Sequence, residues 1–132
     1  MVSLSHAAQK PLEFIGSSKE ALSAFPADVK RVIGHALHLA QIGGKAEYTK
    51  PLSGDPVFRG ATAMEIVDDF DGETYRAVYT VKFAGVVYVL HAFQKKSKKG
   101  IATPRHEVAL IKARLKRAQE HFKENYRTVR LG

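Results

Sequence analysis

Two stretches of the chain carry apolar residues at the spacing of an amphipathic helix. The first stretch follows Pro26, a residue that suits the first position of a helix, and ends at Gly43 and Gly44. Its apolar stripe consists of Val29, Val32, Ile33, Ala36, Leu37 and Ala40. A shorter helix is predicted before it, starting at a capping box formed by Ser17 and Glu20. The two helices are expected to form a hairpin.

The second stretch is the last predicted helix. Thr103 is expected to be its N-cap and Pro104 its first residue, and Glu107 places a favourable negative charge in the first turn. Its buried stripe consists of Val108, Ile111, Leu115, Ala118 and Phe122. The basic residues on the same helix are expected largely on its other faces; they are Lys112, Arg114, Lys116 and Arg117.

Three strands are predicted between these helices, at residues 61–67, 75–82 and 86–93. The turn at residues 69–72 and the break at Ala84 and Gly85 are close enough together to indicate an antiparallel meander. A short strand at 12–15 precedes the helical pair, and residues 45–60 are interpreted as a polar loop. The expected fold is therefore α+β, with an N-terminal helical hairpin, an antiparallel meander sheet and a C-terminal helix. Residues 1–132 are predicted to form a single domain, with 1–10 as a flexible lead-in.

Positive charge is concentrated in the last third of the chain. The protein has a formal net charge of +8. Residues 1–90 carry nine Lys/Arg and ten Asp/Glu, whereas residues 91–132 carry twelve Lys/Arg and three Glu. This asymmetry indicates a local field that attracts a polyanion such as RNA. A solvated basic helix without a partner is the alternative interpretation.

Several classes of protein are not favoured by the sequence. The chain has no cysteine, which excludes a disulfide scaffold and a thiolate metal site. His35 and His38 have the spacing of a helical metal pair but no evident third ligand, so we expect no metal and no cofactor. The longest apolar stretch, residues 84–93, is far shorter than the roughly 20 residues that span a bilayer. With no secretory signal visible, we expect a cytoplasmic protein that does not bind membranes.

The candidate site lies where the predicted strands meet the basic loop. Arg76 is within the middle strand of the meander, where it can hold a phosphate or form a structural ion pair with Glu65 on the preceding strand. The loop after the last strand contains four lysines in five positions: Lys95, Lys96, Lys98 and Lys99. Such a loop can neutralise phosphates, although it can equally be a solvated edge that prevents strand aggregation.

His91 and Phe93 complete this candidate site. Strand alternation places both on the same face as Lys95. His91 can transfer protons near neutral pH and Phe93 can stack on a base, whereas the alternative for His91 is a satisfied core or edge residue. RNA cleavage through the 2′-hydroxyl needs a proton acceptor, cations for the charged phosphorane and a proton donor. Glu65 or His91, Arg76 with Lys95 and Lys96, and again His91 could fill these roles without a metal.

The stretch from residue 50 to residue 117 resembles the RelE/HigB toxin superfamily, especially its phage-derived-protein branch. The matching segments are Lys50-Pro51-Leu52 with Gly54, Met64-Glu65-Ile66, Tyr75-Arg76-Ala77-Val78-Tyr79, Val89-Leu90-His91-Ala92-Phe93-Gln94-Lys95-Lys96-Ser97, and then Thr103-Pro104, Glu107 and Arg114. The resemblance implies a compact fold like the one expected above. It also implies a type II toxin that cleaves mRNA on the ribosome and forms a hetero-oligomer with a helix-turn-helix antitoxin.

The resemblance also implies roles for individual residues. Arg76 resembles the strand arginine that contacts the scissile phosphate, and Lys96, with Lys95, resembles the basic residue after the last strand. Glu65 falls at a position on the active-site face. The predicted catalytic residues are thus Arg76, His91, Lys96 and Glu65, and the predicted RNA-binding residues are Lys50, Phe93, Lys95, Lys98 and Lys99.

Two departures from the family pattern leave other functions open. Many relatives have an arginine where Val67 stands, and the tyrosine that some RelE toxins use as a base has no match near Thr103. A non-catalytic inhibitor of DNA gyrase like the ParE toxins, which share the fold, is one alternative. A degenerate phage-derived protein that only binds nucleic acid is another.

Overall fold

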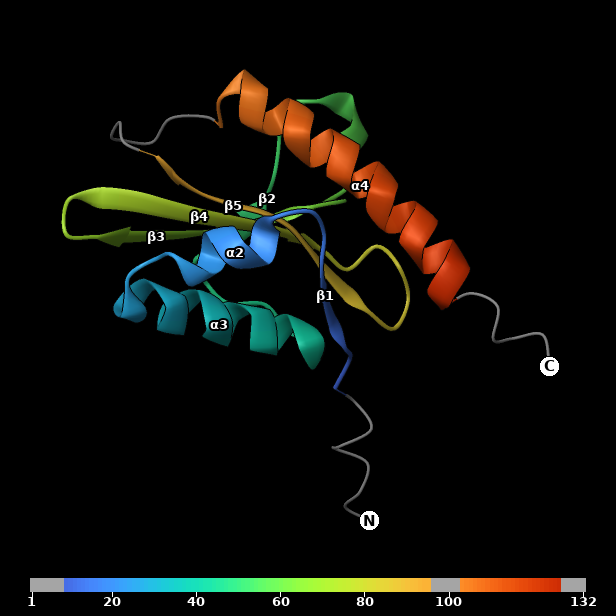
Figure 1. Cartoon of the computed structure of the whole chain (residues 1–132), viewed down its shortest axis with the longest axis horizontal. Coiled ribbons are helices and arrows are strands. Elements are labelled where there is room, and N and C mark those ends of the chain that lie inside the picture. Colours follow the sequence, from blue (N-terminus) through green and yellow to red (C-terminus); the bar gives the residue numbers. More distant parts are fainter. Residues whose placement is uncertain (1–8, 96–102, 127–132) are drawn as a thin grey trace, which may run out of the picture.

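The computed structural model describes residues 9–95 and 103–126 and contains a five-stranded sheet with helices on both faces (Figure 1). The strand order is β1-β5-β4-β3-β2. Along the chain the elements are β1 (Leu12–Phe14), α2 (Ser18–Ser23), α3 (Ala27–Gln41), β2 (Thr49–Pro51), the 3-10 turn η1 (Pro56–Phe58), β3 (Met64–Phe70), β4 (Glu73–Thr80), β5 (Val87–Lys95) and α4 (Arg105–Asn125). The predicted α+β class is therefore confirmed. The flexible lead-in predicted for the N-terminus falls mostly on residues 1–8, outside the described residues.

The sheet separates two hydrophobic cores. On one face, α2 and α3 cover the first core, which includes Ile33 and Leu37 of α3 and Ile66 and Ala77 of the sheet. On the other face, α4 crosses the sheet (Figure 1) and buries the second core, which includes Ile111 of α4 and Phe58 of η1. The stripes predicted for α3 and α4 face these cores. Among the described residues, no helix is long and apolar enough to cross a membrane.

The start predicted for α2 is confirmed, whereas α3 and α4 each begin one residue later than predicted, and tertiary contacts take both hydroxyls that were expected to act as caps. Ser17 is the N-cap of α2, but its hydroxyl makes no cap hydrogen bond and instead accepts one from Arg114 at 3.1 Å. Thr103 does not cap α4, because Pro104 is the N-cap and the Thr103 hydroxyl donates to Glu65 at 2.9 Å. Pro26 is likewise one residue outside α3, as its N-cap.

The meander is antiparallel as predicted, although its first strand begins three residues later than expected. Gly60 and Ala61 both have positive φ, so the chain is still turning there and β3 begins only at Met64. At the next turn, Asp71 and Gly72 have φ of 54° and 81°, the backbone of a two-residue type I′ hairpin loop. The segment interpreted as a polar loop contains one further strand, β2, which pairs antiparallel with β3 at the sheet edge.

A bulge in β5 decides which side chains face α4. Val78 pairs with His91 and the next residue, Tyr79, pairs with Val89, so Leu90 is an extra residue in β5. Leu90 belongs to the core beneath α4, and His91 bonds to side chains of the same helix. The bulge thus turns two consecutive side chains towards α4.

Candidate functional site

The side chains of the candidate site share the face of the sheet that α4 covers. Val78 is in the core under α4, and in the antiparallel ladder it is opposite both Glu65 and His91. Residues directly opposite one another, and those two positions along a strand, are on the same face. This places the following residues together: Lys50, Glu65, Arg76, His91, Phe93 and Lys95. The expected common face of His91, Phe93 and Lys95 is therefore confirmed.

Glu65 and Arg76 form a buried ion pair. Arg76 Nη1 is 2.9 Å from Glu65 Oε2, and the two residues are only 4% and 2% exposed. Thr103, two residues before α4, donates a second hydrogen bond to the same Glu65 oxygen at 2.9 Å. The pair predicted from the sequence therefore exists, and it also ties the start of α4 to the sheet. Because a buried charge is costly unless paired, each partner depends on the other.

Two lysines lie close enough to this pair to affect its charge balance. Lys95 is buried at the end of β5, and Lys50 of β2 is directly opposite Glu65 in the ladder. Burial lowers the pKa of Lys95, and the positive charges of Arg76 and Lys50 lower that pKa further, against the opposing effect of Glu65. We call Lys50, Glu65, Arg76 and Lys95 the strand-end cluster. It gathers three cations around one carboxylate, an arrangement suited to a phosphate.

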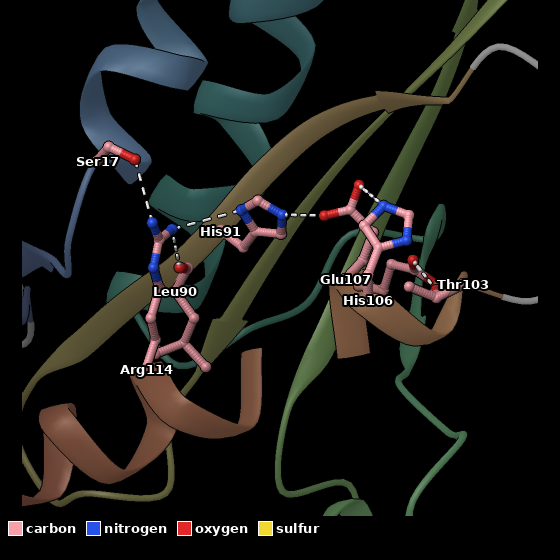
Figure 2. A network of polar contacts seen from close by, with 8 residues as sticks. Ser17, Leu90, His91, Thr103, His106, Glu107 and Arg114 are labelled. Carbon is pink, nitrogen blue, oxygen red and sulfur yellow. Dashed lines mark hydrogen bonds and ion pairs between the residues drawn. The ribbon is translucent and has the colours of Figure 1, made fainter. Parts of the chain in front are cut away.

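His91 lies between a carboxylate and a guanidinium of α4 (Figure 2). Its Nε2 is 2.5 Å from Glu107 Oε1, and its Nδ1 is 3.4 Å from Arg114 Nη1. An arginine can only donate, so Nδ1 must accept and the proton of the neutral ring is on Nε2, donated to Glu107. Burial lowers the pKa of His91, and Arg114 and His106 add to this effect, whereas Glu107 opposes it.

Arg114 was expected largely off the buried face of α4, and this expectation was wrong. The residue is 9% exposed. Besides approaching His91, its Nη1 donates to the Leu90 carbonyl oxygen at 2.9 Å and its Nη2 donates to the Ser17 hydroxyl at 3.1 Å. A Cβ at Gly16, where φ is +60°, would come within 2.8 Å of Arg114 Nε. Arg114 is thus fixed between α4, the β5 bulge and the chain entering α2.

Phe93 is 8% exposed and stacks on the His91 ring, with centroids 4.9 Å apart and planes 22° apart. It is also the direct ladder partner of Arg76. Phe93 therefore connects the strand-end cluster with His91. Lys96, Lys98 and Lys99, the remaining predicted site residues, lie outside the described residues.

No group of three or more possible metal ligands occurs among the His, Asp and Glu side chains of residues 9–95 and 103–126. His35 and His38 are both exposed on α3.

A comparison with protein families matches most of the chain. The family described as "Phage derived protein Gp49-like" matches residues 20–116 of the 132 residues. The chain belongs to the Gp49-like family. This confirms the resemblance to the phage-derived branch of the RelE/HigB-like toxins that the sequence motifs indicated.

No curated protein matches this Gp49-like chain. Among solved structures, a chain from the toxin-antitoxin complex RelBE2 of Mycobacterium tuberculosis aligns with it at a TM-score of 0.44 and 14% identity. The alignment covers 68% of the Gp49-like chain and 95% of the other chain.

Three residues of the Gp49-like site were not singled out as site residues from the sequence: Thr103, Glu107 and Arg114. The positional signal for Arg114 was present, because it is three residues after Ile111 and four before Ala118, and so on the apolar side of α4. Thr103 and Glu107 were interpreted from their neighbours in sequence, as the N-cap and as a favourable charge in the first turn of the last helix. Their partners Glu65 and His91 are 38 and 16 residues away along the chain.

Proposed function

We propose that this Gp49-like protein is the toxin of a type II toxin–antitoxin pair and inhibits translation by cutting mRNA on the ribosome. The observation that carries the proposal is the strand-end cluster, with its three cations around a single carboxylate on the face next to His91 and Phe93. Cations held in place by a sheet are suited to stabilise the extra charge of a phosphorane. The activity would be that of a metal-independent endoribonuclease in the cytoplasm.

Each part of the cluster has a role in this proposal. Arg76, fixed by Glu65, presents its guanidinium to the scissile phosphate, and Lys95 with Lys96 neutralises the charge that develops on it. His91 and Glu65, the groups that the sequence suggested for proton transfer, are proposed to support it by position, since Glu65 holds Arg76 and His91 bonds to Glu107. The cleavage moves the 2′-hydroxyl proton to the protein, forms the 2′-oxygen–phosphorus bond and breaks the bond to the 5′-oxygen, which then receives a proton.

Binding of the RNA chain is proposed for the residues around this centre. Lys50 is the exposed member of the strand-end cluster, and Lys98 and Lys99 add positive charge shortly after β5 in the sequence. Backbone phosphates account for such contacts without sequence selection. Phe93, which stacks on His91 at the same site, is proposed to contact a base near the scissile bond.

The proposed partner in the resting cell is a small helix-turn-helix antitoxin that covers the basic surface with an acidic or amphipathic segment. The concentration of positive charge after residue 90 supports this, because opposite charges steer and orient association. The affinity of the complex should fall with rising salt and after charge reversal of Lys95 and Lys96. If neither salt nor the charge reversals changed the affinity for the antitoxin, this part of the proposal would be contradicted.

Expression in bacteria, followed by mapping of mRNA ends, tests the proposed activity. The wild type should arrest growth and cut mRNA within translated regions, whereas Lys50→Glu should weaken both effects by reversing an exposed positive charge opposite Glu65, the partner of Arg76. Lys30→Glu is the matched control, because Lys30 is exposed on α3 across the sheet. Intact mRNA with stalled gyrase complexes would replace the proposal with gyrase inhibition, and a harmless wild type would refute a toxin.

A further inference from the structure

The reaction proposed above needs a group that takes the 2′-hydroxyl proton, and Glu65 is poorly placed for this. Its side chain is 3% exposed. Arg76 and Thr103 both donate to its Oε2 at 2.9 Å, so protonation of that oxygen would work against two hydrogen bonds. The geometry of Glu65 fits a residue that holds Arg76 and the start of α4 in place.

Glu107 is a second carboxylate, in the first turn of α4 and four residues after Thr103, and it is more exposed than Glu65 of β3. Its side chain is 18% exposed. Oε1 is bound to His91, while Oε2 is 3.3 Å from Nε2 of His106, whose own side chain is 79% exposed. Figure 2 shows the carboxylate between the two imidazole rings. Since His106 can swing into solvent, Oε2 is the oxygen that a substrate can reach.

The contacts behind Glu107 hold it in one orientation. Arg114 occupies the Nδ1 side of His91, which leaves the ring proton on Nε2 and directs it at Glu107 Oε1. Arg114 is itself fixed by the Leu90 carbonyl oxygen and the Ser17 hydroxyl (Figure 2). A base in a proton-transfer site is held in place by a further group, and here His91 holds Glu107 while Arg114 holds His91.

Glu107 is also next to the strand-end cluster. Thr103, four residues before it, bonds to Glu65 of that cluster. From the sheet side, its partner His91 stacks on Phe93, the ladder partner of Arg76. A ribose positioned with its phosphate on Arg76 would therefore lie beside the first turn of α4.

We propose that Glu107 is the general base of this protein, with His91 and Arg114 as positioning residues. The inference rests on the proposed ribonuclease function. Glu107 Oε2 takes the proton of the 2′-hydroxyl, the 2′-oxygen forms a bond to phosphorus, and the bond from phosphorus to the 5′-oxygen breaks. The Lys95 ammonium gives its proton to the leaving 5′-oxygen, and solvent then returns the proton from Glu107 to Lys95. Water relays this proton but is not consumed, and no electrons are transferred.

This assignment predicts a specific pH dependence. Only ionised Glu107 can accept the proton, so cleavage should fall at acidic pH. The charged groups that face it are His91 of β5 and His106 and Arg114 of α4. Gln at position 107 can still accept the hydrogen bond from His91 but cannot take a proton. Glu107→Gln should therefore remove the acidic limb of the pH profile while α4 stays docked.

Single-turnover cleavage of mRNA on purified translating ribosomes tests the inference. Glu107→Gln should slow cleavage by about 100-fold or more, the usual contribution of general base catalysis. Glu107→Asp should retain part of the activity and the acidic limb, and Glu120→Gln, an exposed change on the same helix, should cleave like the wild type. Thermal unfolding of each variant shows whether α4 remains folded.

Other results would overturn the assignment. If Glu107→Gln cleaved mRNA at the wild-type rate and with an unchanged pH profile, another group would be the base. Activity lost only in proportion to the folded fraction would make Glu107 a purely structural residue. Loss of cleavage in Arg76→Lys together with full activity in Glu107→Gln would reject this inference alone. A wild type that leaves the mRNA intact would instead reject the proposed ribonuclease function.

Discussion

The buried ion pair between Glu65 and Arg76 allows a quantitative test of how this sheet is held together. Replacing Arg76 with Met leaves the Glu65 carboxylate, 2% exposed, without the guanidinium that lies 2.9 Å away. Replacing Glu65 with Leu leaves the positive charge of Arg76 without this carboxylate. Breaking a buried pair from one side costs about 3–5 kcal/mol, whereas replacing both partners by apolar residues is often close to neutral.

The expected result is therefore strongly non-additive. Each single variant should lose about 3–5 kcal/mol of unfolding free energy, a large part of the roughly 5–15 kcal/mol that a domain has. The double variant should recover most of that loss. Urea denaturation followed by circular dichroism, without RNA present, measures all four proteins in one double-mutant cycle.

A surface pair in the same chain provides the control. Arg31 and Asp28 of α3 are 3.0 Å apart, but their side chains are 69% and 59% exposed. Water and salt screen such a pair, so removing either partner should change stability by less than about 1 kcal/mol. If changes at Glu65 or Arg76 cost no more than changes at Arg31, or if the two single losses simply add, the account of a mutually dependent buried pair is wrong.

Three further predictions follow from other contacts. Gly16→Ala should destabilise the fold by at least about 1–2 kcal/mol in thermal denaturation, since φ is +60° and the new Cβ would meet Arg114 at 2.8 Å; wild-type stability would contradict this. Burial lowers the pKa of His91, so the unfolded chain binds more protons than the folded protein. The free energy of unfolding should therefore fall as the pH drops below about 6.5. Denaturation at several pH values should show a weaker dependence in His91→Gln. Tyr126→Phe should cost about 1 kcal/mol by removing the hydroxyl that donates to Glu13. That bond, together with burial and the negative charge of Glu13, raises the pKa of Tyr126 to about 12. The wild-type advantage should therefore fade as the pH rises above about 10, and an advantage independent of pH would refute the assigned cause.

The elements that could be predicted from the sequence are those with a strong local period. The stripe from Val29 to Ala40 and the one from Val108 to Ala118 both face a core. Asp71 and Gly72 form the hairpin turn that their residue types favour. The short strand β2 had no such signal, because Lys50 and Pro51 are exposed and only three residues pair at a sheet edge.

The errors at the helix starts have a common physical cause. A cap was assigned to Ser17 and another to Thr103 from their neighbours in sequence, but both hydroxyls serve partners from distant segments. Arg114 is 97 residues from Ser17, and Glu65 is 38 residues from Thr103. A hydroxyl beside a buried charge makes a stronger hydrogen bond than it would as a helix cap, and such a partner cannot be recognised from local spacing.

Strand alternation predicted only the part of the candidate site that lies on the sheet. Alternation correctly placed Phe93 and Lys95 on one face with His91, and the next two strands of the sheet supplied Arg76 from β4 and Glu65 from β3. Strand alternation could not predict which side chains of α4 contact this face of the sheet.

The partners of His91 come from α4, and the bulge at Leu90 turns the histidine towards that helix. The sequence left open whether His91 is a free proton donor or a satisfied residue. In the structure Glu107 is bonded to its Nε2, and Arg114 is near its Nδ1.

The most direct test of the central claim is the chemistry of the RNA ends produced in a purified translation reaction. The account predicts that the wild type cuts mRNA on the ribosome and leaves a 2′,3′-cyclic phosphate and a 5′-hydroxyl, because the 2′-oxygen attacks the phosphorus held at Arg76. Arg76→Lys, which keeps the charge but loses the planar fork of donors, should cut far more slowly. Intact mRNA in the presence of folded wild-type protein, or cut ends that carry a 3′-hydroxyl, would contradict it.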